Sequence, residues 1–424
     1  MRILLIGSGG RESAIARSLS LSPECEALFI APGNAGTGEY GTNVALQPLD
    51  FEGIGAFVDA EGIDMVVVGP EAPLVDGIRE YLEGREGRKP LIVGPGKAGA
   101  ALEGSKDFAK EFMGRHGIPT ARHLTVRRGE EGAGDAFLES LKPPYVLKAD
   151  GLAAGKGVLI IDNIAEAKRE LRDMLAGAFG AASAKVVIEE YLRGIECSVF
   201  VLTDGNGGYV VLPPAKDYKR IGEGDTGLNT GGMGAVCPPP FADTEFMAKV
   251  EDRVVLPTLA GLRAEGIDYR GFIFLGLMKT GNDPMVIEYN ARMGDPETEA
   301  VMPRIVSDIV PLLAGAAGGN LGAAALEVDP RTAVTVMAVA GGYPGNYAKG
   351  TPMTIGTIPA DSILFHAGTT TDSEGRTVTA GGRVIAATGL AGDVAHAAAL
   401  SFEAIEAVDY EGKYYRRDIG KDVI

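Results

Sequence analysis

The amino-acid sequence predicts a multidomain protein of α/β and α+β class. We expect an N-terminal Rossmann-like parallel sheet, a central domain built from strand hairpins, and a C-terminal mixed α+β domain. Three observations lead to this expectation. The 424 residues exceed the usual size of a single domain. Residues 1–103 alternate short apolar runs with helix-like stretches, whereas from about Leu102 the strand-like runs are joined by glycine-containing turns.

The N-terminal unit has the rhythm of strands and helices that builds a parallel sheet. A helix is expected over Glu12–Leu19, between strand-like runs that read RILLIG, ALFIAPGN, IDMVVVGPE and LIVGPG. Folds of this type bind ligands in the loops at the carboxyl ends of their strands. We therefore expect a binding site along one edge of this sheet.

The central unit begins with a helix over Lys106–His116, for which Ser105 is the expected N-cap. Strand-like runs follow, and a turn at Asp204–Gly208 joins two of them. A long loop is expected over Pro213–Pro240, then a helix over Asp243–Glu265. The strand-like runs of this unit are PYVLKA, GVLII, KVVIEEYL, ECSVFVLT, GFIFLGLMKT and PMVIEYN.

The C-terminal unit follows a boundary in the glycine- and alanine-rich segment Ala314–Ala325. The apolar patterns beyond it predict three strands and one closing helix. The strands are expected over Ala333–Ala340, Ser362–Gly368 and Arg383–Thr388, and the helix over Ala391–Val408.

Charge and composition exclude several classes of function. A formal net charge of −17 would repel nucleic-acid backbones and anionic lipids, so neither nucleic acid nor a membrane is an expected partner. The three cysteines and four histidines lack metal-ligand spacing, which argues against zinc and disulfides. No signal-peptide pattern or membrane-length apolar run is present, so a cytoplasmic location is expected.

The N-terminal loops suggest a small-molecule site. In GSGGRES, Gly7–Ser13, glycines lie between a strand and a helix, where backbone N–H groups can face an anion. Glu12 occupies the place of the third glycine of a dinucleotide fingerprint, and Ala31–Gly33 replaces the acid that would bind a ribose, so nicotinamide binding is disfavoured. APGNAGT and GPEAPL end the next strands. Ordinary turns are the alternative interpretation of each loop.

A stronger signal is KADGLAAGKG, Lys148–Gly157. Lys148 ends a strand and Lys156 lies inside a glycine-rich hairpin, so both could reach one triphosphate. Three glycines, at 151, 155 and 157, would let the backbone approach phosphate closely and move as a lid. The order of residues is not that of a P-loop. A solvated hairpin is the alternative.

The segment Val286–Glu299 is the most informative. Residues two apart in a strand share a face, so Glu288 and Asn290 would present their oxygens together, a sparse set that suits magnesium beside phosphates. If the strand continues, Arg292 lies on that face and can grip a carboxylate or phosphate. The turn at Gly294–Glu297 adds two acids. A surface network of arginine and acids is the alternative.

Two further segments are weaker signals. Acidic side chains and main-chain groups at Ile188–Glu196 would suit an adenine amino group and a ribose, although acidic strand ends are usually just solvated. The loop Lys216–Gly234 is too polar and irregular for a core, and such loops are usually kept for binding. A disordered surface linker is the alternative for this loop.

Together these segments resemble the ATP-grasp superfamily and, within it, the phosphoribosylamine–glycine ligase family, also called glycinamide ribonucleotide synthetase. The resemblance covers essentially the whole chain in family order. It includes GSGGRES, APGNAGT, VVGPEAPL, LEGSKDFAK, KADGLAAGKGV, NTGGMG, RMGDPE, AGGYPGNYAKG, GGRVIAATG and YYRRDIG. It implies an N-terminal domain over 1–103, an ATP-grasp domain over 104–312 with a lid at about 121–191, and a C-terminal domain over 326–424.

The resemblance implies that ATP drives the joining of glycine to 5-phosphoribosylamine in purine biosynthesis, with Mg²⁺ or Mn²⁺, and that these small molecules are the partners of a monomer or weak dimer. It also implies roles for particular residues. Metal binding falls to Glu288 and Asn290, and catalysis to Arg292, Lys148, Asp217 and Asp295. ATP binding falls to Lys106, Lys148, Gly151, Gly155, Lys156, Gly157, Glu189, Glu190, Tyr191, Leu192 and Glu196. Substrate binding falls to Gly9, Asn34, Glu71, Asp217, Lys219, Arg292, Asp295 and Glu297.

The sequence departs from the family pattern at positions that carry none of the implied phosphate or metal ligands. The family often has histidine, glutamine or proline there, which puts the fine geometry of substrate binding in doubt and not the reaction class. No extra enzyme domain follows, so a single activity is expected. Two other functions stay open: another ATP-grasp ligase or carboxylase, and a nucleotide-binding module without catalysis. The departures are Ser13, Lys216, Tyr218, Leu228 and Glu299.

Overall fold

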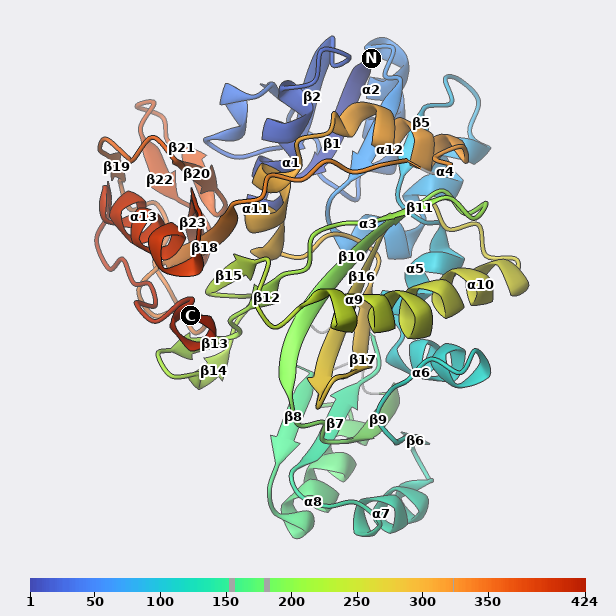
Figure 1. The fold of residues 1–424 in the computed structure, drawn as a ribbon. Coiled ribbons are helices and arrows are strands. Elements are labelled where there is room, and N and C mark those ends of the chain that lie inside the picture. Colours follow the sequence, from blue (N-terminus) through green and yellow to red (C-terminus); the bar gives the residue numbers. More distant parts are fainter. Residues whose placement is uncertain (152–156, 179–183, 323) are drawn as a thin grey trace.

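A computed structural model describes residues 1–151, 157–178, 184–322 and 324–424. Three lobes surround a central sheet: a parallel sheet at the top of the view, a C-terminal lobe at the left and a small sheet with two helices at the bottom (Figure 1). Within the described ranges, no helix is both long enough and apolar enough to cross a membrane.

The N-terminal sheet is parallel, as expected, with strand order β3-β2-β1-β4-β5. Its strands other than the short edge strand β3 are mainly apolar because both faces are covered: Ile3 and Leu5 of β1 join one hydrophobic cluster, and Leu4 and Ile6 join another. The elements are β1 (Arg2–Gly7), α1 (Gly10–Ser20), β2 (Ala27–Pro32), η1 (Thr37–Glu39), β3 (Thr42–Asn43), α2 (Phe51–Ala60), β4 (Met65–Val68), α3 (Glu71–Asp76), α4 (Ile78–Gly84) and β5 (Leu91–Val93).

Two helices lead from this sheet into the lower lobe. The hydroxyl of Ser105 accepts a hydrogen bond from the Phe108 N–H at 3.1 Å, so Ser105 is the N-cap, as predicted. The lower sheet has strand order β6-β9-β7-β8, and α7 and α8 pack on one of its faces. The elements are α5 (Lys97–Gly104), α6 (Lys106–Arg115), β6 (His123–Arg127), α7 (Glu131–Glu139), β7 (Tyr145–Ala149), β8 (Val158–Ile161), α8 (Ile164–Leu175) and β9 (Lys185–Glu190).

The central sheet is antiparallel, with strand order β11-β10-β16-β17. The expected turn at Asp204–Gly208 joins β10 to β11. The predicted helix over Asp243–Glu265 is also confirmed, with a π-helical turn ahead of Pro257. Its elements are β10 (Ile195–Thr203), β11 (Tyr209–Val211), α9 (Thr244–Val250), the π-turn η3 (Glu251–Val255), α10 (Leu256–Ala264), β16 (Gly271–Thr280) and β17 (Asp283–Asn290).

The expected long loop over Pro213–Pro240 is wrong, because it contains four short strands. Two of them, β12 and β15, pair with the C-terminal strands in the order β12-β15-β18-β23-β20. β15 is apolar and buried against β18, but it is only four residues long and follows a run of glycines that hides its pattern. The strands are β12 (Lys216–Asp217), β13 (Arg220–Gly222), β14 (Thr226–Asn229) and β15 (Gly234–Cys237).

The rest of the chain returns to the N-terminal sheet and then forms the C-terminal lobe. α11 packs against α1, and α12, which spans position 312, packs against β5. The three predicted C-terminal strands and the helix are confirmed. The elements are α11 (Glu297–Val301), η4 (Met302–Arg304), α12 (Ile309–Gly318), β18 (Thr332–Val339), β19 (Thr354–Ile355), β20 (Ser362–His366), β21 (Thr369–Thr371), β22 (Thr377–Thr379), β23 (Arg383–Ala391), α13 (Val394–Glu406), β24 (Val408–Asp409) and η5 (Lys421–Val423).

Candidate active site

A buried carboxylate joins two lysines at the face of the lower sheet that α7 and α8 leave free. Leu147 and Ile188 point to those helices, so the next residues, Lys148 and Glu189, point to the opposite face. Lys148 Nζ lies 2.9 Å from one Glu189 oxygen, and Lys110 Nζ of α6 lies 2.9 Å from the other. Two ammonium groups therefore share one carboxylate, which leaves a positive charge for an anion.

The electrostatics of this trio follow from its burial. Burial lowers the pKa of Lys110 to about 8, although the Glu189 charge opposes the shift. Burial alone would raise the pKa of Glu189, but Lys148 and Lys110 outweigh it, so the pKa of this carboxyl is lowered. The resemblance implied that Glu189 contacts adenosine. In the structure its carboxylate pairs with the two lysines.

Lys106 approaches the same place from α6, one turn before Lys110. Its Nζ donates a hydrogen bond to the Gly151 carbonyl at 2.9 Å, at the beginning of the glycine-rich loop. Burial lowers the pKa of Lys106. The loop joins the antiparallel strands β7 and β8, and the Ala149 N–H closes its base on the Gly157 carbonyl at 2.8 Å. Gly155 and Lys156, two of the implied ATP contacts, lie outside the described residues.

Glu288 and Asn290 occupy alternate positions of β17, on the face opposite Tyr289, which packs into the core under α9 and α10. Lys148 Nζ lies 3.4 Å from the Ile287 carbonyl, so this strand end adjoins the lysines. Among the described residues, no protein group forms a hydrogen bond or ion pair with either side chain, and no cluster of three or more histidine, cysteine or acidic ligands occurs. Two free oxygen ligands beside cations suit a divalent ion that phosphates also hold.

Arg292 lies beyond the end of β17, so the strand does not continue through it. Its guanidinium bridges two acids of the N-terminal elements: Glu103 at 2.8 Å and Glu71 at 3.3 Å. Glu103 also accepts the Ala291 N–H at 2.7 Å. Burial alone would lower the pKa of Arg292, but these two carboxylates raise it above its ordinary value. The arginine is therefore a fixed positive charge at the border between the N-terminal and central sheets.

A second charged cluster lies where β12 meets β10. Lys219 forms an ion pair with Glu196, an implied ATP contact, and its Nζ lies 3.9 Å from Asp217. Ser198 donates a hydrogen bond to Glu297 at 2.9 Å. Burial raises the pKa of Asp217 to about 7, with Glu297 and Glu196 adding to the shift and Lys219 opposing it. A buried carboxyl with a pKa near neutrality is suited to transferring a proton.

Asp295 joins the N-terminal loop to the C-terminal sheet. Arg383 Nη2 lies 3.1 Å from its carboxylate, and the Arg11 N–H points to the same group at 3.4 Å. A Cβ atom on Gly9 would lie only 3.2 Å from an Asp295 oxygen, so glycine permits this approach. Glu299, beside Asp295, is fully buried, and burial together with the Asp295 charge raises the pKa of Glu299 well above its ordinary value.

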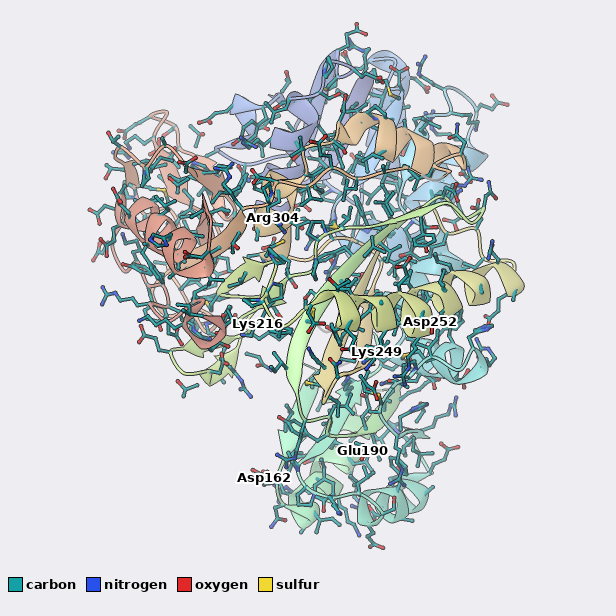
Figure 2. The ribbon with its side chains drawn as sticks, viewed as in Figure 1. Asp162, Glu190, Lys216, Lys249, Asp252 and Arg304 are labelled. Carbon is teal, nitrogen blue, oxygen red and sulfur yellow. The ribbon has the colours of Figure 1, made fainter. Side chains whose placement is uncertain are left out.

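The remaining sequence-predicted residues hold loops around these clusters. Asn34 donates to the carbonyls of Ser8 and His366, both at 2.9 Å, and thereby joins β2 to the C-terminal lobe. Glu190 lies where the lower sheet meets the central sheet, and Lys216 lies at the border of the C-terminal lobe (Figure 2). Tyr191 and Leu192 follow Glu190 and are half-buried.

Sequence reasoning missed several residues of these clusters because their partners are distant in the chain. Lys110 lies four residues after Lys106 on one helix, so helical spacing could have indicated it. Nothing local distinguishes the others. They are Arg11, Glu103 and Arg383.

Three family models match consecutive parts of the chain. They are described as the Phosphoribosylglycinamide synthetase N domain, over residues 1–103, its ATP-grasp (A) domain, over 104–298, and its C domain, over 333–422. In a solved structure with 16% identity and a TM-score of 0.73, the biotin carboxylase domain of Hydrogenobacter thermophilus 2-oxoglutarate carboxylase is in complex with MgADP and bicarbonate. The superposition covers 97% of this chain and 91% of that structure, and it shows a shared fold alone.

Two closer relatives carry the name that the resemblance implied. The phosphoribosylamine–glycine ligase of Chlorobaculum tepidum is 44% identical over an alignment of 428 positions, which covers 99% of each chain. The crystal structure of phosphoribosylamine–glycine ligase from Thermotoga maritima is 36% identical and superposes with a TM-score of 0.84 over 99% of this chain and 100% of its own. Identity of this extent along the full length shows that the chain belongs to the phosphoribosylglycinamide synthetase family.

Proposed function

We propose that this protein is an ATP-dependent ligase that joins glycine to 5-phosphoribosylamine, with glycinamide ribonucleotide, ADP and phosphate as products. One arrangement carries the proposal: Lys106 and Lys148 converge on one side of the β17 end, and the Asp217 and Lys219 cluster lies by β10 of the same sheet. The first group suits a triphosphate. The second suits an amine and a carboxylate.

In the first step a glycine carboxylate oxygen attacks the γ-phosphorus of ATP, and the bond to the β,γ-bridging oxygen breaks to release ADP. Lys106 and Lys148 neutralise the charge that develops on the phosphate oxygens. Glu288 and Asn290 are the residues that would hold a divalent cation, Mg²⁺ or Mn²⁺, which supplies further charge neutralisation when bound. Arg292 stabilises the transferring phosphoryl group or the glycine carboxylate.

In the second step the phosphoribosylamine nitrogen attacks the carbonyl carbon of the glycyl phosphate, the bond from carbon to the phosphate oxygen breaks, and phosphate leaves. The nitrogen must lose one proton. Asp217, whose pKa lies near 7, accepts it, with Lys219 beside it and Glu297 held by Ser198. Gly9, Asn34, Glu71 and Asp295 line the ribose-phosphate side.

We assign adenosine binding to Glu190, at the end of β9, and to Tyr191, Leu192 and Glu196, where the lower and central sheets meet. The described start of the glycine-rich loop, Gly151, lies beside Lys106, and we assign to this loop the exclusion of water, because water would hydrolyse an acyl phosphate. The partners are small molecules, and the protein acts in the cytoplasm as a monomer or weak dimer.

The test is product formation from purified components. The protein, ATP, MgCl₂, glycine and freshly generated phosphoribosylamine are mixed, and glycinamide ribonucleotide is detected by mass spectrometry. The expected result is one product and one ADP per turnover, with both lost when glycine is omitted. ADP formation at the same rate without glycine would contradict the proposal. Unchanged turnover of Glu288→Ala would contradict the metal assignment.

A further inference from the structure

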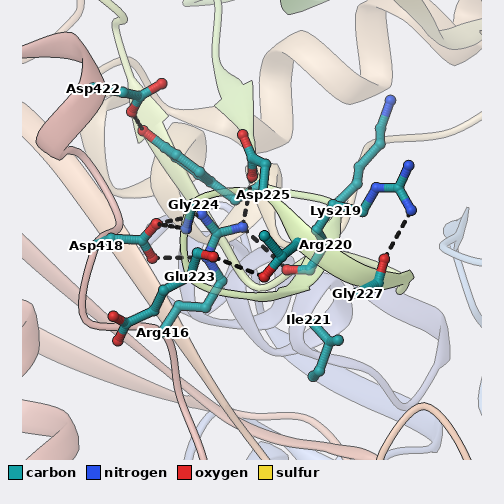
Figure 3. Close-up of polar contacts among 12 residues, drawn as sticks. Lys219, Arg220, Ile221, Glu223, Gly224, Asp225, Gly227, Arg416, Asp418 and Asp422 are labelled. Atoms are coloured by element: carbon teal, nitrogen blue, oxygen red, sulfur yellow. Dashed lines mark hydrogen bonds and ion pairs between the residues drawn. The ribbon is translucent and has the colours of Figure 1, made fainter.

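The C-terminal segment, Tyr414–Ile424, packs against the loop Lys216–Gly234, which we call the Asp217 loop. The centre of this contact is Arg416, a charged side chain that is only 1% exposed (Figure 3). Its Nη1 donates to the Arg220 carbonyl at 3.1 Å and lies 2.7 Å from the Asp225 carboxylate. One guanidinium thus contacts both the main chain and a side chain of the Asp217 loop.

Neighbours of Arg416 extend the contact along the hairpin β13–β14. Asp418 accepts two parallel hydrogen bonds from Arg416, at 2.8 and 2.7 Å, and also the Gly224 N–H at 2.8 Å. The Arg417 N–H donates to Glu223 at 3.1 Å, and the Tyr414 hydroxyl donates to the Ile221 carbonyl at 3.0 Å. Ionic and polar contacts therefore connect the segment to the base and tip of the hairpin.

The same segment holds both neighbours of Asp217. The Tyr218 hydroxyl donates to Asp422 at 2.6 Å, and Lys216 Nζ lies 3.0 Å from that carboxylate. Successive side chains of an extended chain point to opposite sides, so Lys216 and Tyr218 face the C-terminal segment while Asp217 and Lys219 face the central sheet. Fixing one side of this strand therefore fixes the other.

Little else holds the hairpin. All four residues of β14 are exposed, and Leu228 is 65% exposed, so the described apolar packing of this hairpin comes from the half-buried Ile221 of β13. A hairpin with so small a buried face is marginal in water and depends on its tertiary contacts. The bidentate pairing of a buried arginine with a carboxylate is among the most directional of such contacts.

We propose that Arg416 is a positioning residue that sets the place of Asp217 and Lys219 in the substrate cluster by holding the opposite side of the Asp217 loop. The inference rests on the proposed function, because it concerns how these two side chains meet glycine and the amine. Arg416 touches neither Lys106 nor Lys148, so the ATP phosphate site does not depend on it.

The test is steady-state kinetics of Arg416→Met for each substrate in turn. We expect kcat/KM for glycine and for phosphoribosylamine to fall roughly tenfold to hundredfold, since small displacements of positioned groups have effects of that size. The KM for ATP should rise much less than the KM for glycine or the amine, because Lys106 and Lys148 keep their contacts and Glu196 is the adenosine residue that pairs with Lys219. Arg416→Lys should restore part of the loss, since lysine can pair with one carboxylate but lacks the fork.

Arg376→Met is the matched control, because Arg376 also pairs with two acids of the C-terminal lobe, Asp372 at 2.9 Å and Glu374 at 3.3 Å, but is exposed and lies outside the described contacts of the loop. It should leave all three kcat/KM values unchanged. If Arg416→Met fails to fold, Asp225→Asn removes the negative charge from the 2.7 Å contact on the loop side and should give the same pattern in weaker form.

The outcomes separate the two proposals. A wild-type protein that makes no glycinamide ribonucleotide contradicts the proposed function itself. An active wild type whose Arg416→Met and Asp225→Asn variants keep the wild-type glycine and phosphoribosylamine parameters contradicts the inference alone. An equal rise in the KM values for ATP, glycine and the amine would also overturn it, because that pattern indicates general damage to the fold.

Discussion

Replacement of Lys148 by methionine should separate catalysis from stability. Lys148 and Lys110 each lie 2.9 Å from Glu189, so the trio carries one more positive than negative charge. Without Lys148, Glu189 still has Lys110 as its buried partner, and methionine keeps most of the packing. The unfolding free energy should therefore fall by only about 1 kcal/mol. Turnover should fall about 10²- to 10³-fold, the size found when one charge-stabilising donor is removed.

Two matched variants sharpen this prediction. Lys110→Met breaks an equal contact with Glu189, but the Lys110 ammonium is already engaged with Thr120 at 2.7 Å, so turnover should change less than about tenfold. Glu189→Gln leaves two buried ammonium groups without a counter-charge and should destabilise the protein by about 3–5 kcal/mol. Phosphate release and urea unfolding measure the two effects. Equal activity losses for Lys148→Met and Lys110→Met would refute the assignment of Lys148 to the phosphates.

Three other replacements test the remaining clusters. In the wild type, kcat/KM for phosphoribosylamine should rise with pH through the Asp217 pKa of about 7. Asp217→Asn should lower the rate roughly 10²- to 10⁴-fold and abolish this inflection of the pH profile. An unchanged inflection in the variant would count against Asp217 as the base. Glu299 keeps its proton in the folded state above the pH where the unfolded chain loses it, so stability falls as pH rises above 4.5. Glu299→Gln should remove this slope, up to about 1.4 kcal/mol per pH unit, in unfolding experiments at pH 5 and 8; identical slopes in both proteins would disprove it. Asn290→Ala should raise the half-saturating Mg²⁺ concentration roughly tenfold or more with an unchanged unfolding midpoint, and an unaltered Mg²⁺ dependence would exclude Asn290 as a ligand.

Local patterns were sufficient to predict much of the fold. Each strand of the parallel sheet longer than two residues contains a continuous apolar run, because helices cover both faces, and a serine N-cap marks the beginning of α6. The alternation of Glu288 and Asn290 also predicted their shared face. These features depend on neighbours in the sequence, so the sequence displays them directly.

Features that depend on distant partners could not be predicted in this way. β12 consists of two charged residues, and β15 is four residues long and follows a run of glycines, so neither can be recognised without β18, which pairs with β15 from about a hundred residues later. The spacing predicts Arg292 on the same face as Glu288 and Asn290, but the strand ends at Asn290. The partners of Arg292, Glu71 and Glu103, lie in the N-terminal part of the chain. The Tyr414–Ile424 segment contains the family motif YYRRDIG, but the contacts of this motif with the Asp217 loop are visible only in the folded chain.

The most direct measurement of the central claim follows an oxygen atom. Glycine labelled with ¹⁸O in both carboxylate oxygens is supplied with ATP, MgCl₂ and phosphoribosylamine, and the released phosphate and the product are analysed by mass spectrometry. If ATP activates the glycine carboxylate as an acyl phosphate, each phosphate carries one ¹⁸O and the amide of glycinamide ribonucleotide keeps the other. Unlabelled phosphate would contradict the account.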